Sequence, residues 1–253
     1  MTDFIQLKDA PFFAPFMKDS TFLGLPSVDP HGAFAVLHNT QNSFVLSPQK
    51  QPSLIIKFPK YHLMVSCDKE AALLNQFSAG KDDVFSTPRA LAFGASPEFL
   101  MMNRMAKPFA VSTAGEELTH RQAEKIGIAF GSFSAMTFRQ GMIHTDFHFG
   151  NVTQEPDGKI GILDFAALRH APLEQLLSCP ILTNDILAHS IAKTFCALTG
   201  ERFGLGKLQG EKTYLFAKMH NNPSLTPDIL DRHQAVFDRF MAKAKQTPSC
   251  FYS

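Results

Sequence analysis

Apolar residues fall in short runs along the first hundred residues, separated by Pro, Gly, Asn and Ser. Such runs predict β-strands, in which successive side chains point to opposite faces. Five strands are expected, at "GAFAVLHN" (32–39), "NSFVLS" (42–47), "SLIIKFP" (53–59), "ALAFG" (90–94) and "EFLMMN" (98–103). One helix is predicted among them, in "SCDKEAALLNQFSAG", where Ala71, Leu74 and Phe77 recur at helical spacing between the N-cap candidate Ser66 and Gly80.

Longer helical patterns begin near residue 117. A helix is predicted from Glu117 to Gly141, because apolar residues form a stripe along it. The stripe consists of Ile126, Phe130, Phe133 and Met136 to Phe138. Two short strands follow, "NVTQEP" and "KIGILDF", joined by the turn Asp157-Gly158. The rest is predicted to be mostly helical, in "LEQLLSC", "NDILAHSIAKTFCALTG" and "PDILDRHQAVFDRFMAKAKQ".

The change of pattern predicts two lobes. Residues 1–105 form the expected β-rich lobe, residues 106–253 the expected α-helical lobe, and "AKPFAVSTAGEE" (106–117) the linker. With 253 residues and a hydrophobic fraction of 45%, the chain can bury a sizeable core.

Composition narrows the class of partner. The 24 basic and 23 acidic side chains leave a net charge of +1, so no overall field attracts nucleic acid or an anionic membrane. An anionic ligand has to be held by local groups. No transmembrane segment is expected, because no stretch approaches the roughly 20 apolar residues of a membrane span. The four cysteines form no C-x-x-C pair, which favours free thiols in a reducing compartment such as the cytoplasm.

Three polar residues around the predicted hairpin carry the candidate chemistry. Asp146 lies in a loop after the long helix, Asn151 follows in the same loop, and Asp164 closes the apolar strand "KIGILDF". Transfer of a phosphoryl group from a nucleotide needs a cation on the phosphates, oxygen ligands for magnesium, and a carboxylate that orients the acceptor hydroxyl. Two oxygen-bearing side chains on adjacent hairpin strands are placed to converge on one magnesium ion.

The same residues carry a resemblance to a known family. "HTDFHFGN" followed by "ILDFA" resembles the catalytic loop H-x-D-x-x-x-x-N and the metal-binding D-F-G of the protein-kinase-like superfamily. Its atypical branches are more similar than ordinary protein kinases: aminoglycoside and choline phosphotransferases, RIO-type kinases and lipopolysaccharide kinases. The resemblance implies a two-lobed α+β fold with ATP and Mg²⁺ in the cleft. It also implies that Asp146 is the catalytic base, that Asn151 and, above all, Asp164 bind magnesium, and that His144 braces the loop.

The resemblance extends to the phosphate-binding lysine. "SLIIKFPK" is similar to the strand that carries it, which assigns the role to Lys57, with Lys60 as the competing candidate. Strand alternation places Lys57 on one face with Ile55. Glu70, on the predicted helix, resembles the ion-pair partner of this lysine, and Asp68 competes with it.

The adenine and phosphate contacts are predicted from the same comparison. "PRALAFGASPEFLMMNRMA" resembles the strand pair that leads to the hinge, which implies that the backbone of Met102, Asn103 and Arg104 binds adenine. No G-x-G-x-x-G covers the expected first hairpin, where the nearest candidate turn is "LPSVDPHG" (25–32) with Ser27 and Gly32. Backbone contacts to the phosphates therefore depart from the family pattern.

The segment after Asp164 bears on the acceptor. The third residue of the metal motif is Ala166 instead of glycine, and only "FAALRHAP" separates Asp164 from a helix predicted near Leu173. The long activation segment and A-P-E anchor that support a peptide substrate are missing, so the expected acceptor is a hydroxyl of a small molecule or glycolipid. The alternatives are a minimal protein kinase, such as a secreted bacterial effector, and a nucleotide-binding pseudokinase.

Other polar residues near the motif allow different interpretations. His144 and His148 are spaced as in H-x-x-x-H, but that spacing binds zinc best on a helix, and Gly150 with its neighbours suits a loop. His148 is interpreted as a packing or substrate-side residue. Arg169 and His170 either contact an anionic acceptor or lie on a surface loop.

Overall fold

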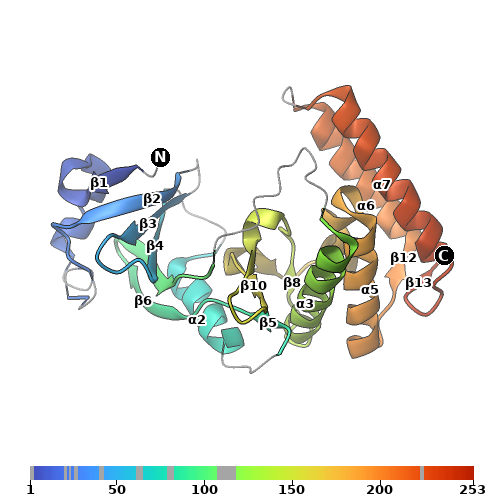
Figure 1. Cartoon of the computed structure of the whole chain (residues 1–253), viewed down its shortest axis with the longest axis horizontal. Helices are drawn as coiled ribbons and strands as arrows, with labels where there is room; N and C mark the ends of the chain where they lie inside the picture. The colour runs from blue at the N-terminus through green and yellow to red at the C-terminus, as the bar shows by residue number, and fades with distance from the viewer. Residues whose placement is uncertain are drawn as a thin grey trace. The chain divides into compact units, whose positions relative to one another are not determined.

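The computed structural model describes residues 3–19, 22, 24–25, 28–39, 43–60, 65–78, 83–106, 118–222 and 225–253. Contacts divide the chain into two compact units, one of Met1–Lys81 with Thr87–Met105 and one of Asp82–Ser86 with Ala106–Ser253. The first is β-rich and the second mainly helical (Figure 1). The predicted two-lobed, kinase-like α+β fold class is confirmed. Most of the predicted linker, residues 107–117, lies outside the described residues.

The first unit is built on a six-stranded antiparallel sheet with the order β1-β2-β3-β4-β7-β6. The strands are β1 (Phe4–Gln6), β2 (Ala33–Asn39), β3 (Ser43–Pro48), β4 (Leu54–Pro59), β6 (Ala90–Ala95) and β7 (Glu98–Asn103). The five strands predicted from short apolar runs are all present, and the predicted helix is α2 (Cys67–Ser78). Ser66 precedes this helix as expected, whereas Gly80 lies outside the described residues.

Phenylalanines cover one face of this sheet. β4 turns Leu54, Ile56 and Phe58 towards a buried cluster, here called the phenylalanine cluster. Phe13, Phe16 and Phe22, from the chain before β2, complete it. Three 3₁₀-helices belong to that N-terminal segment, η1 (Leu7–Asp9), η2 (Pro11–Phe13) and η3 (Phe16–Lys18). The ring of Phe16 lies 4.6 Å from that of Phe58, edge to face, an arrangement that aromatic pairs favour. The sequence patterns did not predict this N-terminal layer, which accounts for several of the 25 phenylalanines.

The second unit contains five α-helices among its described residues. They are α3 (His120–Phe138), α4 (Pro180–Thr183), α5 (Asp185–Thr199), α6 (Leu205–His220) and α7 (Pro227–Lys245). α3 packs closely on α5 because Gly127 and Gly131 face it: a Cβ at Gly127 would lie 2.4 Å from the Cβ of Ser190. α3 begins later than predicted, because Thr119 and Gln122 form a capping box before His120. The predicted start, Glu117, lies outside the described residues.

Two helical segments differ from the sequence prediction. "LEQLLSC" forms the 3₁₀-helix η6 (Leu173–Leu177) and a turn before α4, where Pro180 begins a new helix. α6 was not singled out, because its apolar pattern is weak: Leu208 is its one buried residue in the described part of the chain. Figure 1 shows α6 beside α7. None of the described helices is long and apolar enough to cross a membrane.

Short strands frame the loops of the second unit. β9 (Val152–Gln154) and β10 (Ile160–Ile162) form the predicted hairpin, and β5 (Phe85–Ser86) pairs with β10 on its other side. Gly158 has a φ of 86°, which suits glycine and supports the predicted Asp157-Gly158 turn. β8 (Ile143–His144) pairs with β11 (Leu168–Arg169), and β12 (Phe203–Gly204) pairs with β13 (Phe251–Tyr252).

The phenylalanine cluster gives a first prediction. Phe16→Ala should lower the free energy of unfolding by about 3–5 kcal/mol, because the ring is 4% exposed and its loss leaves a cavity. Phe12→Ala is the matched control, since Phe12 lies in the same segment but is 42% exposed; about 1 kcal/mol or less is expected. Urea unfolding of the three proteins measures both. Equal losses for the two variants would contradict the buried layer.

An ion network between α5 and α7 gives a second prediction. Burial opposes ionisation of Asp185, but hydrogen bonds from Lys243 (2.6 Å) and Arg239 (3.2 Å) outweigh it and lower the pKa of this carboxyl. Asp185→Asn should therefore cost about 2 kcal/mol at pH 7. The wild-type advantage is fully present above the unfolded-state pKa of about 4 and is lost as the pH falls through the lowered folded-state pKa. Urea unfolding of both proteins at pH 7 and at pH 3 tests this; a gap that persists undiminished in acid would contradict it.

Candidate functional site

Lys57 and Glu70 form a buried ion pair in the β-rich unit. The Nζ atom of Lys57 lies 3.0 Å from Oε1 and 2.9 Å from Oε2 of Glu70, and the side chains are only 12% and 3% exposed. Alternation along β4 explains the direction of Lys57: the residues on either side of it enter the phenylalanine cluster, so Lys57 faces α2. The Lys57 ammonium group is thus held by a buried carboxylate on the face of β4 opposite the phenylalanine cluster. A cation ordered in this way can bind phosphate oxygens.

Lys60 and Asp68, the competing candidates for the phosphate-binding lysine and its partner, make other contacts. Lys60 is bonded to Oδ1 of Asn39 and lies over the ring of Phe44. Asp68 is exposed on α2, where hydrogen bonds from the Ser66 hydroxyl and from the backbone of Lys69 lower the pKa of its carboxyl. The structure therefore brings together the two residues that were preferred from the sequence, and it does not bring Lys60 or Asp68 to that pair.

The predicted adenine-binding segment lies at the end of β7. Met102 is paired within the sheet to both neighbouring strands, opposite Ile55 and Ala90. The N–H of Asn103 donates to the carbonyl of Arg89 (3.2 Å), and that of Arg104 donates to the carbonyl of Ser53 (2.7 Å). These two amide donors are already used by the fold. Any backbone contact to adenine from this segment therefore has to involve carbonyl oxygens, or an amide beyond Arg104.

His144 is buried beneath the loop that carries Asp146. Its Nε2 atom lies 3.1 Å from the carbonyl oxygen of Leu163, so Nε2 carries the proton and donates it. Burial lowers the pKa of this imidazole, which favours its neutral form, and its ring packs edge-on against Phe130. The contact joins the strand before the loop to the residue before Asp164. His144 thus braces the loop, as the resemblance implied, and its bond to Leu163 also ties that loop to the strand before Asp164.

Asp146 and His148 lie in the open part of the same loop. The Asp146 side chain is 59% exposed, and its Oδ2 atom lies 3.9 Å from Nε2 of His148. The ring of His148 lies over Gly150, where a Cβ would come within 2.8 Å of it. The two histidines of the motif therefore make different contacts, His144 inside the core and His148 beside Asp146. In the described part of the chain, His, Cys, Asp and Glu form no cluster of three or more suited to a metal.

Asn151 links the loop to the strand that ends in Asp164. Its side-chain Nδ2 atom donates to the backbone carbonyl of Asp146 (3.0 Å). Its backbone carbonyl accepts from the N–H of Leu163 (2.9 Å). The antiparallel register of β9 and β10 thus places Asn151 and Asp164 at the same end of the hairpin. Both supply oxygen atoms, the ligand type that magnesium prefers, so the residues present fit this ion.

Asp164 has an unusual backbone. Its φ of 59° and ψ of 67° lie in the left-handed region, where it is alone among the described residues other than glycine. Aspartate tolerates this region better than most residues, yet the conformation still has a cost, and such strain clusters at functional sites. The following 3₁₀-helix η5 (Phe165–Ala167) and β11 return the chain to β8, where the N–H of Thr145 donates to the carbonyl of Ala167 (3.1 Å).

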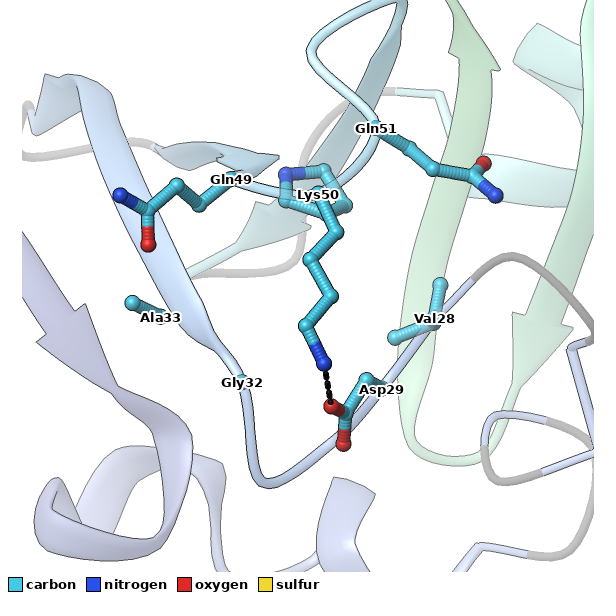
Figure 2. A pocket seen from close by; sticks show the side chains of 8 residues that line it. Val28, Asp29, Gly32, Ala33, Gln49, Lys50 and Gln51 are labelled. Atoms are coloured by element: carbon cyan, nitrogen blue, oxygen red, sulfur yellow. Dashed lines mark hydrogen bonds and ion pairs between the residues drawn. The ribbon is translucent and has the colours of Figure 1, made fainter.

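The segment "LPSVDPHG" (25–32), the nearest candidate for the turn of the first hairpin, does not join the first two predicted strands, so this candidate was wrong. β2 and β3 are joined through residues 40–42, which lie outside the described residues, whereas "LPSVDPHG" leads into β2 at its other end. Ser27 also lies outside the described residues, and Gly32 lines a cavity of about 220 Å³. Figure 2 shows Lys50 reaching across that cavity to Asp29, 3.0 Å away. Lys57 and Glu70 are not among the residues that line it.

Comparison with known proteins supports the kinase-like assignment. Residues 68–181 match the model of the ABC1 atypical kinase-like domain, a segment that includes Glu70, Asp146, Asn151 and Asp164 but not Lys57. The resemblance to the atypical branch of the protein-kinase-like superfamily is confirmed, and the match supports a kinase-like phosphotransferase. A comparison with curated proteins found no match.

Solved structures give more distant similarities. The chain is 15% identical to Rv3197 from Mycobacterium tuberculosis, solved as a complex with erythromycin, over 82% of this chain and 71% of that one, with a TM-score of 0.42. Two structures of WbdD, described as a bifunctional kinase-methyltransferase, are 18% and 17% identical over 86% and 87% of this chain, each with a TM-score of 0.42. The chain spans about half the length of WbdD, 49% and 50% in the two structures. Scores of this size support no functional inference.

The buried ion pair gives a third prediction. Lys57→Met should lower the free energy of unfolding by about 3 kcal/mol, because it leaves the Glu70 carboxylate buried without a partner. The double variant Lys57→Met/Glu70→Met should recover most of that loss, since no unpaired charge remains. Urea unfolding of the wild type and the two variants measures both effects. A double variant no more stable than Lys57→Met would contradict the coupling of the pair.

Proposed function

We propose that the protein is an ATP- and Mg²⁺-dependent phosphotransferase that moves the γ-phosphoryl group to a hydroxyl acceptor. The observation that carries the proposal is the hydrogen-bonded link through Asn151. This residue joins the loop of Asp146 to the strand before Asp164 with contacts of 3.0 and 2.9 Å. It thus brings together, in one unit, a solvent-accessible carboxylate and two candidate oxygen ligands. The confirmed kinase-like resemblance supports the same assignment.

In the proposed mechanism each residue acts through charge and position. Asp164 and the Oδ1 atom of Asn151 hold magnesium; the Nδ2 donation to Asp146 fixes which end of the Asn151 amide is the oxygen. A bound magnesium ion neutralises charge that develops on the phosphates. Lys57, kept in place by Glu70, binds phosphate oxygens. Asp146 aligns the acceptor hydroxyl and takes its proton. Most of the rate gain then comes from positioning and electrostatics.

The proposed acceptor is a small molecule or a glycolipid. The support is the short connection after Asp164: η5, β11 and the residues up to Pro172 fill the whole interval before η6. The middle of that interval is held, at Ala167 by Thr145 and at Leu168 by β8. An interval of this length has no room for the extended platform on which a peptide substrate is laid.

The catalytic assignment gives a fourth prediction. Asp146→Asn and Asp164→Asn should each lower phosphoryl transfer at least about a hundredfold, because one removes the proton acceptor and the other a magnesium ligand. Both substitutions keep the side-chain shape, so circular dichroism should remain that of the wild type. Asp157→Asn is the control: Asp157 lies in the exposed hairpin turn, and activity should stay within about twofold. Wild-type activity in either catalytic variant would contradict the mechanism.

The acceptor class is tested by labelling. Purified protein, [γ-³²P]ATP and a cell lysate are incubated with the wild type and with Asp146→Asn as the background. Label in small molecules or lipid extracts, dependent on Asp146, is the expected result. Label in protein bands instead would identify a minimal protein kinase. Nucleotide binding without hydrolysis or transfer would identify a pseudokinase and overturn the proposal.

A further inference from the structure

The N-terminus of α2 is held by a side chain from another strand. The backbone N–H of Cys67, the first residue of α2, donates to Oε1 of Glu98 at 2.9 Å. Glu98 is the first residue of β7 and follows Cys67 by 31 positions. The first amides of a helix have no acceptor within the helix. A carboxylate at this end supplies one and also interacts favourably with the helix dipole.

The local residue does not make this contact. Ser66 was the N-cap candidate, but its hydroxyl is hydrogen-bonded to the Asp68 carboxylate. The Ser66 carbonyl accepts from the N–H of Glu70 at 2.9 Å, as the first bond of the helix. The amide of Cys67 is therefore anchored to β7 and not to its own turn.

The sheet register places the anchor beside the ion pair. Leu100 of β7 is the cross-strand partner of Lys57 of β4, and paired residues in antiparallel strands point to the same face. Glu98 lies two residues before Leu100, so alternation puts it on that face as well. Neighbouring Phe99 enters the phenylalanine cluster on the opposite face, in agreement. Glu98 and Lys57 therefore face α2 from adjacent strands.

The helix is thus attached to the sheet at two points, one turn apart. Glu98 holds the amide of Cys67, and Lys57 holds the carboxylate of Glu70, three residues further along α2. Both helical residues are buried, Cys67 at 3% and Glu70 at 2% exposure. A helix fixed at one point can still pivot, whereas two attachments also fix its direction.

We propose that Glu98 is a positioning residue for Lys57: its carboxylate anchors the start of α2 so that Glu70 stays on the lysine. In the proposed reaction this keeps the Lys57 ammonium aimed at the phosphates. The inference rests on the proposed function only for the role of Lys57. The anchoring itself is a property of the β-rich unit and can be measured without a nucleotide.

Cys67 and Lys57 are built-in probes of the anchor. Burial raises the pKa of the Cys67 thiol to about 12, so alkylation should be slow in the wild type. Glu98→Ala should speed alkylation of Cys67 by iodoacetamide, and acylation of Lys57 by an N-hydroxysuccinimide ester, roughly tenfold, as expected for loss of a cap. Rates are read by peptide mass spectrometry, which separates these sites from other thiols and amines.

Two further variants separate the cap from other effects. Glu98→Gln removes the charge but keeps an oxygen for the Cys67 amide, so both labelling rates should stay within about threefold of wild type. Asp29→Ala is the matched control in the same unit, because Asp29 also accepts a backbone N–H, from His31 at 3.0 Å, in the turn before β2. It should leave both rates unchanged. Equal acceleration by Glu98→Ala and Glu98→Gln would indicate an electrostatic effect on the thiol and overturn the cap.

A double-variant cycle with Glu70→Gln shows whether Glu98 acts through Glu70. If it does, Glu98→Ala speeds Lys57 acylation in the wild-type background and adds little in the Glu70→Gln background. The same cycle applied to phosphoryl transfer should show a roughly tenfold loss for Glu98→Ala, mainly in the KM for ATP, and little further loss beside Glu70→Gln. Additive effects on Lys57 labelling would overturn the inference.

The labelling and the activity can fail separately. A wild-type protein that neither binds nor turns over ATP would end the proposed function, while the labelling of Cys67 and Lys57 would still decide whether Glu98 anchors α2. Conversely, an active enzyme whose Glu98→Ala variant labels at the wild-type rate retains its function and overturns the anchoring.

Discussion

A buried ion pair constrains everything around it, because neither partner can leave without stranding a charge in a medium that does not solvate it. In the β-rich unit this constraint falls on Lys57 and Glu70. It explains why β4 has two different faces: every second residue enters the phenylalanine cluster, and the residue between Ile56 and Phe58 carries the cation. The apolar layer fixes the strand, and the strand fixes the ammonium group.

In the helical unit, hydrogen bonds hold the candidate site residues in place. Asp164 adopts a left-handed backbone that costs energy, so its surroundings have to hold it. Two contacts on neighbouring Leu163 do so: its carbonyl accepts from His144, and its N–H donates to Asn151. Because Asn151 also bonds to the backbone of Asp146, the strained residue, the metal-ligand candidate and the candidate base are positioned by one network.

Much of the fold could be predicted from the sequence, because its signals are local. Short apolar runs bounded by turn residues marked β2, β3, β4, β6 and β7, and helical spacing marked α2, α3, α5 and α7. The two short strand patterns joined by Asp157-Gly158 placed the hairpin β9–β10. The preference for Lys57 over Lys60 came mainly from its position in the kinase-like pattern and only partly from alternation, and the contact with Glu70 agrees with it.

The features that were missed depend on distant parts of the chain. The N-terminal 3₁₀-helices have no period to recognise, and Phe13 and Phe16 are buried only because β4 lies beneath them. α6 is mostly exposed and has a weak apolar stripe. The candidate turn of the first hairpin was placed at 25–32, whereas residues 40–42, "TQN", contain neither glycine nor proline to mark a turn. Glu98 follows a Ser-Pro turn, and nothing in its neighbours indicates a helix 31 positions earlier.

The short segment after Asp164 changes where control of such a site would act. In kinases with a long activation segment, activity is controlled by whether that segment is ordered, because its phosphorylation brings the metal motif into place. Here Asp164 is held from Leu163, and the chain beyond it is paired at Ala167 and Leu168. The helical unit thus has no long segment between these contacts to reorder. The ion pair in the other unit depends instead on the direction of α2, whose first amide is held by a single carboxylate. A change at the N-terminus of α2 is therefore the simplest way to alter the Lys57–Glu70 pair without disturbing the loop of Asp146.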